Sequence, residues 1–490
     1  MALKEESSAH IEKALAESTQ FPLSHAEQEH AATTTVQDWT PEEEKKLVWK
    51  IDRRVFPMLC TIYAFSLLDR ANISAAFIAG LDEDVGLAQG SRYSVALLVF
   101  FIGYALFELP SNYVIRRIGA RWWLSFLAVG FGAVVLGMGF IHSWQSLVVL
   151  RTFLGFFEAG LYPGAVYIIA SFYKQYETGK RISFFYMSAL FASGFGPILA
   201  YVFSLIRHGD GIYRQGWRWI FIIEGSLTIV VGLISPLFIA EFPEKASFLD
   251  DREKHIAQAR LHTNQPAQKF KHPTVKESFK MLMDWKILVF SFQYFVAAVS
   301  VYALAYFQPI ILRSGMGYSY ALAQILSSPP YVGAMIFSLT TAWLSDKIRM
   351  RWPIMCSACL VAVTGLLIVL YAKPPGVRYF GLFLAVCGCQ ANAPASLSYG
   401  QNQTAQLGKR GVVAAAMISV GAIGGICGST IFRSQDAPQY LPGMWTTICL
   451  QLAVCVVTFA TSMHLKRLNS LADEGIRPAL EGVEGFRYAP

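Results

Sequence analysis

Residues 151–164 read R-T-F-L-G-F-F-E-A-G-L-Y-P-G and place an arginine and a glutamate inside an otherwise apolar run. Each ionised side chain near the middle of a membrane-spanning helix costs about 2.5–3.5 kcal/mol on insertion scales, so such charges normally face a hydrated or charge-paired interior. Arg151 and Glu158 are about 10 Å apart along an α-helix and fall on nearly the same face. The pair therefore predicts a membrane helix that presents two charges to a protein interior.

The composition of the 490-residue chain indicates a membrane protein. Hydrophobic residues make up 54% of it and charged residues only 15%, and the mean hydropathy is +0.41. The length allows about a dozen helices of ~20 residues each. The net charge of +8 comes largely from basic residues at the ends of apolar runs, where the positive-inside rule places them. We therefore expect the lipid bilayer, and no nucleic acid, as the partner of these charges.

Two short cysteine motifs, C-x-x-C at 356–359 and C-x-C at 387–389, lie in apolar runs without neighbouring histidine or acidic residues. Zinc and redox motifs need such companions or a matching spacing elsewhere. We therefore predict no metal site, and we expect the eight cysteines to be mostly buried free thiols.

Twelve apolar runs predict twelve membrane spans in two groups of six. Their approximate bounds are 56–77, 93–115, 122–141, 146–170, 182–206, 218–240, 286–312, 321–344, 352–372, 378–400, 411–433 and 443–464. The predicted parts are a disordered tail at 1–39, an amphipathic helix along the inner membrane surface at 40–55, a first six-helix half at 56–240, a cytoplasmic linker at 241–285, a second six-helix half at 286–465 and a cytoplasmic tail at 466–490.

Basic residues mark the loops on one side of the predicted membrane. Arg116 and Arg117 follow the second span, and Lys347 and Arg351 follow the eighth, whereas the first loop on the other side is acidic at 82–84. The positive-inside rule therefore predicts that both termini are cytoplasmic. We expect the plasma membrane as the location.

A weak internal repeat relates the two halves. The loops after the second span of each half read S-N-Y-V-I-R-R-I-G-A-R-W at 111–122 and S-D-K-I-R-M-R-W at 345–352. Such repeats are typical of secondary transporters, whose substrate site lies between the halves near the middle of the bilayer.

The first span contributes two further charges, Asp69 and Arg70, about 20 Å into its helix. Arg70 and Arg151 are predicted to reach similar depths from opposite sides, and two guanidinium groups at one cavity suit a carboxylate. Asp69 and Glu158 can take up and release protons. The alternative is internal salt bridges, Asp69 with one arginine and Glu158 with another. Such pairs would also be compatible with transport if they open when substrate arrives.

Two other acids in predicted spans are interpreted as structural. Glu108 precedes Pro110 and is expected to satisfy a broken helical turn, and Glu224 is expected to pair with a loop arginine.

The second half offers amides and phenols in place of charges. Gln390 and Asn392 could hydrogen-bond the far end of a ligand, with contacts between helices as the alternative. Tyr302 could stack on a ring of the ligand, with packing or interface anchoring as the alternative. The glycine-rich run at 421–428 lacks the Lys-Ser/Thr of a phosphate loop and predicts close helix packing.

With these features in place, the chain from about 50 to 465 resembles the major facilitator superfamily and, within it, the anion:cation symporter family, especially its fungal allantoate and nicotinate permeases. The similar stretches are L-D-R-A-N at 68–72, R-x-x-x-G-x-x-x-A at 151–159, L-S-D-K at 344–347 followed by Arg351, and I-F-R-S-Q-D-A-P-Q-Y at 431–440.

The resemblance implies roles for single residues. Asp69 and Glu158 would be protonation sites, Arg70 and Arg151 would bind the anion, and Gln390 and Asn392 would be substrate contacts of the tenth span. A conformational loop motif would comprise Asp346, Lys347 and Arg351 in the second half and Arg116 and Arg117 in the first. The first-half loop departs from the superfamily pattern, because S-N-Y-V-I-R-R-I-G-A-R replaces its glycine and aspartate.

Together, sequence and resemblance predict an all-α polytopic membrane protein of twelve helices in two halves, which is not an enzyme. We expect a monomeric symporter that moves a small organic carboxylate, nicotinate-like in the favoured case, together with protons and without a cofactor. One alternative is a proton-linked exporter of an acidic secondary metabolite, and the other is a non-transporting nutrient sensor of the same fold.

Overall fold

The computed structural model describes residues 39–490 apart from 174, 207–214, 263–280, 282, 349, 405–406, 438, 477–479, 483–485 and 490. All but the last residue of the predicted tail at 1–39 therefore lies outside the described residues. The secondary structure of the described residues is helical, as the sequence predicts.

The chain folds as two groups of helices joined by a polar linker. The first group contains α3 (Pro41–Ala76), η1 (Phe77–Leu81), α4 (Asp82–Val85), α5 (Arg92–Ile118), α6 (Ala120–Met138), α7 (Trp144–Glu158), α8 (Leu161–Phe172), α9 (Gln175–Ser204) and α10 (Gly216–Phe238). The linker contains η3 (Pro243–Lys245) and α11 (Asp251–His262). The second group contains α13 (Trp285–Ile310), η4 (Ile311–Gly315), α14 (Tyr320–Ser327), α15 (Pro329–Ile348), α16 (Trp352–Tyr371), α17 (Pro375–Asn402), α18 (Leu407–Ile431), η5 (Ser434–Asp436), α19 (Leu441–Asp473) and η6 (Leu480–Gly482).

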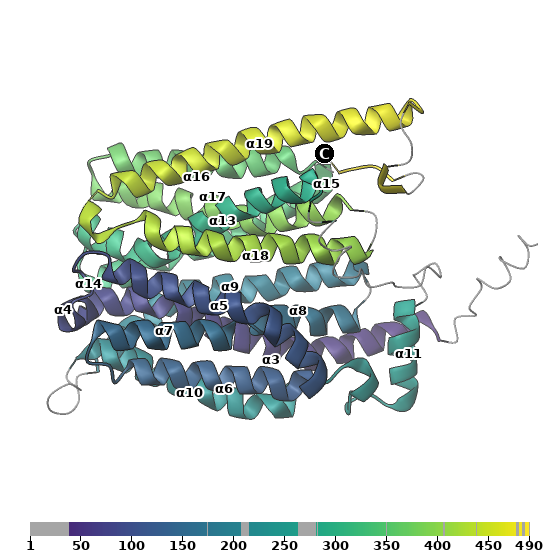
Figure 1. The fold of residues 1–490 in the computed structure, drawn as a ribbon, viewed down its shortest axis with the longest axis horizontal. Coiled ribbons are helices and arrows are strands. Elements are labelled where there is room, and N and C mark those ends of the chain that lie inside the picture. The colour runs from purple at the N-terminus through teal and green to yellow at the C-terminus, as the bar shows by residue number, and fades with distance from the viewer. Residues whose placement is uncertain are drawn as a thin grey trace, which may run out of the picture.

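The two groups lie against each other along their length, with the second above the first in Figure 1. Contacts between α5 and α18 and between α9 and α15 join them. Each predicted span corresponds to one helix or to two consecutive ones, as with α7 and α8 for the fourth span. The twelve-helix arrangement in two halves is thus confirmed.

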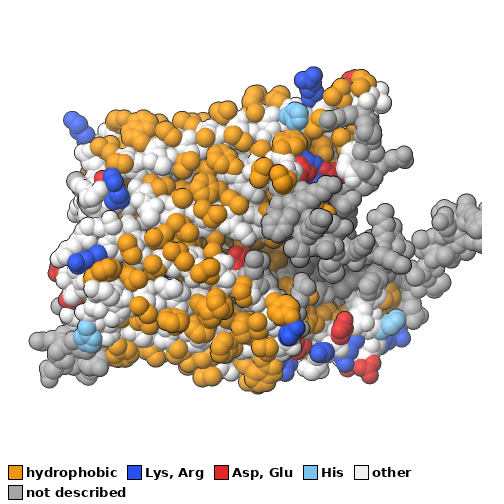
Figure 2. All heavy atoms as spheres, viewed as in Figure 1, with side chains coloured by type: hydrophobic (Ala, Val, Ile, Leu, Met, Phe, Trp, Pro, Cys, Tyr) orange, Lys and Arg blue, Asp and Glu red, His pale blue; other side chains and the backbone are white. Residues whose placement is uncertain are grey.

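The flank of the bundle is apolar. Among the described residues, ten helical segments are long and apolar enough to cross a membrane. The ten segments do not include the first and second predicted spans, which lie in α3 and α5. Hydrophobic side chains cover the flank shown in Figure 2, and most charged side chains gather near its two ends. Large side chains such as Leu106 of α5, Phe184 of α9 and Leu233 of α10 are exposed on the bundle surface. Soluble monomers rarely expose apolar surfaces of this extent, so the flank suits lipid.

The helix α3 begins where the sequence predicts but does not break at residue 55. The Thr40 hydroxyl accepts a hydrogen bond from the Glu43 amide at 3.3 Å, and the Glu43 carboxylate accepts one from the Thr40 amide at 3.0 Å. This capping box fixes the first turn. The predicted helix at 40–55 is present, but it does not form an element separate from the first span. These residues are the first turns of one continuous helix, whose Ile51 is fully buried in the core.

The fourth span is broken directly after Glu158. The helix α7 ends at Glu158, and α8 begins at Leu161. Pro163 has no amide hydrogen for the Ala159 carbonyl, which removes a helical hydrogen bond at this point. A side chain at Gly160 would overlap the Ser111 hydroxyl, so only glycine allows this close approach. The break ends the helix at its buried glutamate.

The C-terminal segment folds back onto the second half. The helix α19 continues past residue 465 to Asp473, and Leu480 and Tyr488 are buried against Ile287 and Leu465. The end of the bundle that carries α11 and this segment is called the α11 end, and the opposite end, at α4 and α14, is called the α4 end (Figure 1).

Candidate functional site

Arg70 and Glu158 form a buried ion pair inside the first half. The Arg70 guanidinium donates to Glu158 Oε1 from Nη2 at 2.6 Å and from Nε at 3.1 Å. Ser66, one helical turn earlier on α3, donates to the same oxygen. Glu158 Oε2 has no hydrogen-bond partner among the described residues. The predicted alternative of a salt bridge therefore holds for Glu158, with Arg70 as its partner.

Arg151 is fully buried and meets no acidic side chain in the described part of the chain. Its Nε donates to the Ala96 carbonyl and its Nη1 to the Arg70 carbonyl, both at 3.3 Å. Nη2 has no hydrogen-bond partner among the described residues. A buried charge without a counter-ion costs several kcal/mol. Arg151 therefore has an unused donor and no ion-pair partner among the described residues.

Both guanidinium groups lie against one aromatic ring. The Arg70 and Arg151 carbons Cζ are 4.9 Å and 5.2 Å from the centre of the Phe100 ring on α5. Helices α3, α5 and α7 thus bring the two arginines together, as predicted. Phe100 carries no polar atom, and the sequence gives no signal that would single it out.

The second half completes this site through Tyr302 on α13. Its hydroxyl accepts a hydrogen bond from Arg70 Nη1 at 2.8 Å. The rings of Tyr302 and Tyr306 stack at 6.2 Å with an interplanar angle of 18°, and Phe101 packs edge-on against Tyr302. Tyr302 therefore lies at the predicted anion site, where it contacts an arginine across the boundary between the halves.

Asp69 does not join this group. Consecutive helical residues point about 100° apart, and Asp69 faces α10, where its Oδ2 accepts a hydrogen bond from Thr228 at 2.9 Å. Neither an arginine nor a lysine pairs with it among the described residues. The prediction of one constellation of four charges is corrected here to Arg70, Arg151 and Glu158, with Asp69 at a separate position.

Glu224 also has a partner that differs from the prediction. It accepts a hydrogen bond from the Asn72 amide rather than pairing with a loop arginine. The nearby Arg218 instead donates to the backbone carbonyls of Gly139 and Ile141 at 3.0 Å and 2.8 Å. Those carbonyls follow the end of α6, where helical acceptors lack partners and attract a cation.

The amides of α17 are buried in the second half. Asn392 donates to Gln451 Oε1 at 3.3 Å, and Gln451 donates to Ser300 at 2.9 Å. These bonds join α17, α19 and α13, so the alternative of helix-to-helix contacts describes Asn392. Gln390 is buried in α17 as well, and its predicted contact with a ligand stays a prediction.

The predicted loop motif is formed in the second half. Arg351 pairs with Asp346 at 3.0 Å and donates to Ser398 on α17 at 2.5 Å. Lys347 lies over the Trp343 ring, with its nitrogen 4.9 Å from the ring centre.

The first-half loop has a different structure, in line with its different sequence. Arg117 donates to the Tyr113 hydroxyl, and the Arg116 side chain lies outside the described part of the structure. Glu241, which the sequence did not single out, accepts a hydrogen bond from the Arg121 amide at 3.1 Å at the start of α6.

The chain matches known proteins over most of its length. The family model of the Major Facilitator Superfamily matches residues 59–429. The chain is 31% identical to the MFS transporter prlL of a fungal species (strain NRRL 50135), over 91% of both chains. It is 29% identical to the high-affinity nicotinic acid transporter of Saccharomyces cerevisiae, over 90% of this chain and 83% of that one.

A solved structure shares the fold. It is a bacterial homologue of the human lysosomal transporter Spinster in an inward-facing conformation, with a TM-score of 0.65 at 18% identity over 87% of this chain and 98% of that chain. The helices, the two halves and these matches agree. The chain therefore belongs to the major facilitator superfamily and is a multi-pass membrane transporter rather than an enzyme.

Proposed function

We propose that the protein is a proton-coupled symporter that imports a small organic carboxylate. The observation that carries this proposal is the contrast between the two buried arginines. Arg70 already binds one carboxylate, that of Glu158, whereas Arg151 has an unused donor and no counter-ion among the described residues. A carboxylate substrate supplies the charge that Arg151 lacks.

The Arg70–Glu158 ion pair couples a proton to this anion. While Glu158 is ionised, it occupies the Nε and Nη2 donors of Arg70. Protonation of Glu158 removes its charge and releases Arg70, which then binds the substrate carboxylate together with Arg151. Proton and anion thus bind together, and the two halves move to expose the site on the other side.

A nicotinate-like monocarboxylate is the favoured substrate. The rings of Phe100, Tyr302 and Tyr306 surround the arginines and offer aromatic faces to a planar ring. The similar protein of Saccharomyces cerevisiae is named as a nicotinic acid transporter, which supports the same choice.

We also propose that the protein is a monomer in the plasma membrane. Its α11 end faces the cytoplasm. Arg117, Arg181 and Lys347 lie in loops or helix ends on that side, whereas residues 82–84 at the α4 end are acidic. The positive-inside rule supports this orientation. Labelling of a cysteine introduced at Glu83, compared with the parent protein that carries only its eight native cysteines, tests the orientation in intact cells. A reagent that cannot cross the membrane should label the variant more than the parent, and equal labelling would contradict this orientation.

A thermal-shift assay of the purified protein tests the carboxylate. Nicotinate should raise the melting temperature, and nicotinamide, which has the same ring without the charge, should not. The Arg151→Gln variant should lose at least tenfold in affinity, because a charge-assisted pair contributes about 1.5–3 kcal/mol. Arg252→Gln, at an exposed arginine of α11, is the control. Equal shifts by nicotinate and nicotinamide, or none from a panel of carboxylates, would overturn the proposal.

A further inference from the structure

The first turns of α3 separate their acidic residues from their basic ones. Three acids of these turns are held against α9 and α11, and each has a basic partner. The pairs are Glu43 with Arg252 at 3.2 Å, Glu44 with Arg260 at 4.0 Å and Asp52 with Arg181 at 2.8 Å. Lys50 likewise pairs with Glu253 of α11 at 2.6 Å. Glu42 is the one acid of residues 41–55 without such a pair in the described part of the chain.

The outward side of the same turns carries basic residues without an acidic partner. Lys45, Trp49 and Arg53 are exposed and four residues apart, so they share one helix face, and Lys46 is exposed beside Lys45. Within the described ranges, no acidic side chain pairs with the four basic residues Lys45, Lys46, Arg53 and Arg54. These four residues and Trp49 are called the α3 basic patch.

Two cations of the patch lie where the apolar surface of a membrane helix ends. The Arg53 carbon Cζ is 4.6 Å from the centre of the Trp49 ring. Arg54 donates from Nη2 to the Leu237 carbonyl at 2.5 Å, and its Cζ is 5.4 Å from the centre of the ring of Phe238, the last residue of α10. Tryptophan and arginine at the ends of membrane helices place their polar groups at the interface with water. The patch therefore lies at the level of the lipid headgroups.

An apolar stripe on α10 leads to this patch. The helix α10 packs against α3, and exposed apolar side chains follow one of its faces at spacings of three or four residues. They are Val230, Leu233, Ile234 and Leu237. An acyl chain that lies along this stripe brings its headgroup phosphate beside Arg53 and Arg54.

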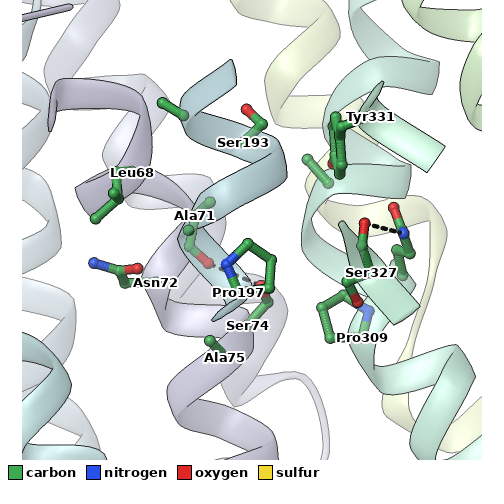
Figure 3. Close-up of a pocket in the computed structure, with 14 residues that line it drawn as sticks. Leu68, Ala71, Asn72, Ser74, Ala75, Ser193, Pro197, Pro309, Ser327 and Tyr331 are labelled. Carbon is green, nitrogen blue, oxygen red and sulfur yellow. Dashed lines mark hydrogen bonds between the residues drawn. The ribbon is translucent and has the colours of Figure 1, made fainter. Parts of the chain in front are cut away.

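The cavity between the halves offers no comparable charge. It has an empty volume of about 380 Å³, and Asn72 lines it from the first half and Ser327 from the second (Figure 3). Its lining, as far as the structure describes it, contains no lysine, arginine, histidine, aspartate or glutamate. A lipid chain in this cavity would meet no charge that distinguishes an anionic headgroup from a zwitterionic one. A preference for anionic lipid therefore reports on a charged outer surface such as the α3 basic patch.

We propose that the α3 basic patch binds the headgroup of an anionic phospholipid in the leaflet at the α11 end, with the acyl chains along the α10 stripe. Guanidinium groups match phosphate oxygens with paired hydrogen bonds, and the lipid supplies the negative charge that these cations lack within the protein. Under the proposed orientation this is the cytoplasmic leaflet, which contains anionic lipids such as phosphatidylserine. The patch is separate from the anion site at Arg70 and Arg151, and lipid binding there does not depend on the identity of the substrate.

Native mass spectrometry of the full-length protein in detergent tests this site. The protein is titrated with phosphatidylserine or with phosphatidylcholine, and the dissociation constant of the first bound lipid is measured. Each basic residue near an anionic lipid contributes about fivefold to the affinity, so the wild type should bind phosphatidylserine about 25-fold more tightly than phosphatidylcholine, or better. Arg53→Gln/Arg54→Gln should lose about 25-fold in affinity for phosphatidylserine and bind phosphatidylcholine nearly as the wild type does.

The control variant is Lys466→Gln/Arg467→Gln, which removes the same charge near the end of α19. It should bind phosphatidylserine as the wild type does. If Arg53→Gln/Arg54→Gln is unstable because Arg54 also holds the end of α10, Lys45→Gln/Lys46→Gln takes its place and should lose about fivefold or more.

Three outcomes would overturn the proposed lipid site. They are equal affinity of the wild type for the two lipids, unchanged affinity of the patch variants for phosphatidylserine, and an equal loss of affinity in the α19 variant. The last outcome would show that the overall charge of this end attracts the lipid without a defined site.

Discussion

Arg70 touches both halves of the protein at once. It is paired with Glu158 of the first half, and it donates to the Tyr302 hydroxyl of the second half at 2.8 Å. A ligand that displaces Glu158 from Arg70 therefore also changes a contact between the halves. The Arg70 side chain thus links ligand binding to the movement of the two halves.

The Tyr302→Phe substitution isolates the contact between the halves. It keeps the ring and removes the acceptor, so buried Arg70 loses one partner. Loss of a hydrogen bond to a charged group costs about 1.5–3 kcal/mol, and we expect the KM of nicotinate uptake to rise at least tenfold. The control is Tyr113→Phe, which removes an arginine-bound hydroxyl at an exposed position. An unchanged KM for Tyr302→Phe would show that this contact has no part in binding.

The sequence predicts that a buried charged site exists, but it predicts less well which residues form that site. Arg70, Arg151 and Glu158 are recognisable because charges in apolar helices must face an interior. The separation of Asp69 from Arg70 follows only from the rotation of α3 about its axis, since neighbouring residues point in different directions. The Asn72–Glu224 contact depends on how α3 and α10 align, which the spacing within one helix cannot specify.

At the scale of helices, α7 positions two of the three site charges and packs very closely on α5. A side chain at Gly155 would overlap the Phe100 carbonyl oxygen and would lie 2.9 Å from the Tyr104 amide nitrogen. Because these atoms belong to the backbone, they cannot move without shifting a helix.

Gly155→Ala should therefore lower both stability and transport. We expect a loss of about 1–3 kcal/mol from overpacking, seen as a lower melting temperature, and slower uptake because α7 carries Arg151 and Glu158. Gly137→Ala on α6 is the matched control, since its added carbon would lie 3.8 Å from the nearest atom, in Leu150. Similar melting temperatures for both variants would contradict the close packing of α5 and α7.

The C-terminal segment is held to the second half by charges. Lys409 donates to Glu481 at 3.0 Å and to Asp284 at 2.8 Å, and Lys286 also pairs with Glu481. Burial opposes ionisation of Glu481, but the hydrogen bonds and charges of the two lysines outweigh it, so the pKa of Glu481 lies below its ordinary value.

This direction predicts that acid loosens the segment. A carboxyl group whose pKa is lowered by folding stabilises the folded state above its unfolded pKa of about 4.3, and the stabilisation is lost as the pH falls through the lower, folded value. Hydrogen exchange of residues 480–482 and 486–489, corrected for intrinsic rates, should accelerate below about pH 4.3 in the wild type. Glu481→Gln should exchange faster already at pH 7. Equal protection of wild type and variant at pH 7 would contradict the role of these ion pairs.

The positions of the helices could largely be predicted from the sequence. The points at which the chain continues a helix, breaks it or folds back could mostly not be predicted. Apolar runs and the Thr40 capping box gave the spans and the start of α3, because these depend on local sequence. Pro163 is a local signal for the break after Glu158. The continuity of α3 through residue 55 and the return of Tyr488 to the bundle depend on contacts with distant residues. No local pattern encodes them.

At the scale of the whole molecule, the structure joins its two halves near the α4 end. Tyr320 donates to Ser204 at 2.7 Å, and Gln324 donates to the Ala75 carbonyl at 3.2 Å. With Tyr93 donating to the Tyr306 carbonyl at 3.2 Å, these bonds close the α4 end in this conformation. Alternating access requires that they break when the site opens there. The sequence cannot indicate which end is closed, because both conformations are formed by the same residues.

Proton-driven accumulation is the central claim, and liposome uptake with an imposed pH gradient tests it most directly. With an acidic exterior, the wild type should concentrate nicotinate inside above its external level, and a protonophore should abolish the concentration. Glu158→Gln should still exchange internal for external nicotinate but should not accumulate it. Accumulation that persists with the protonophore, or unimpaired accumulation by Glu158→Gln, would contradict proton coupling through the Arg70–Glu158 pair.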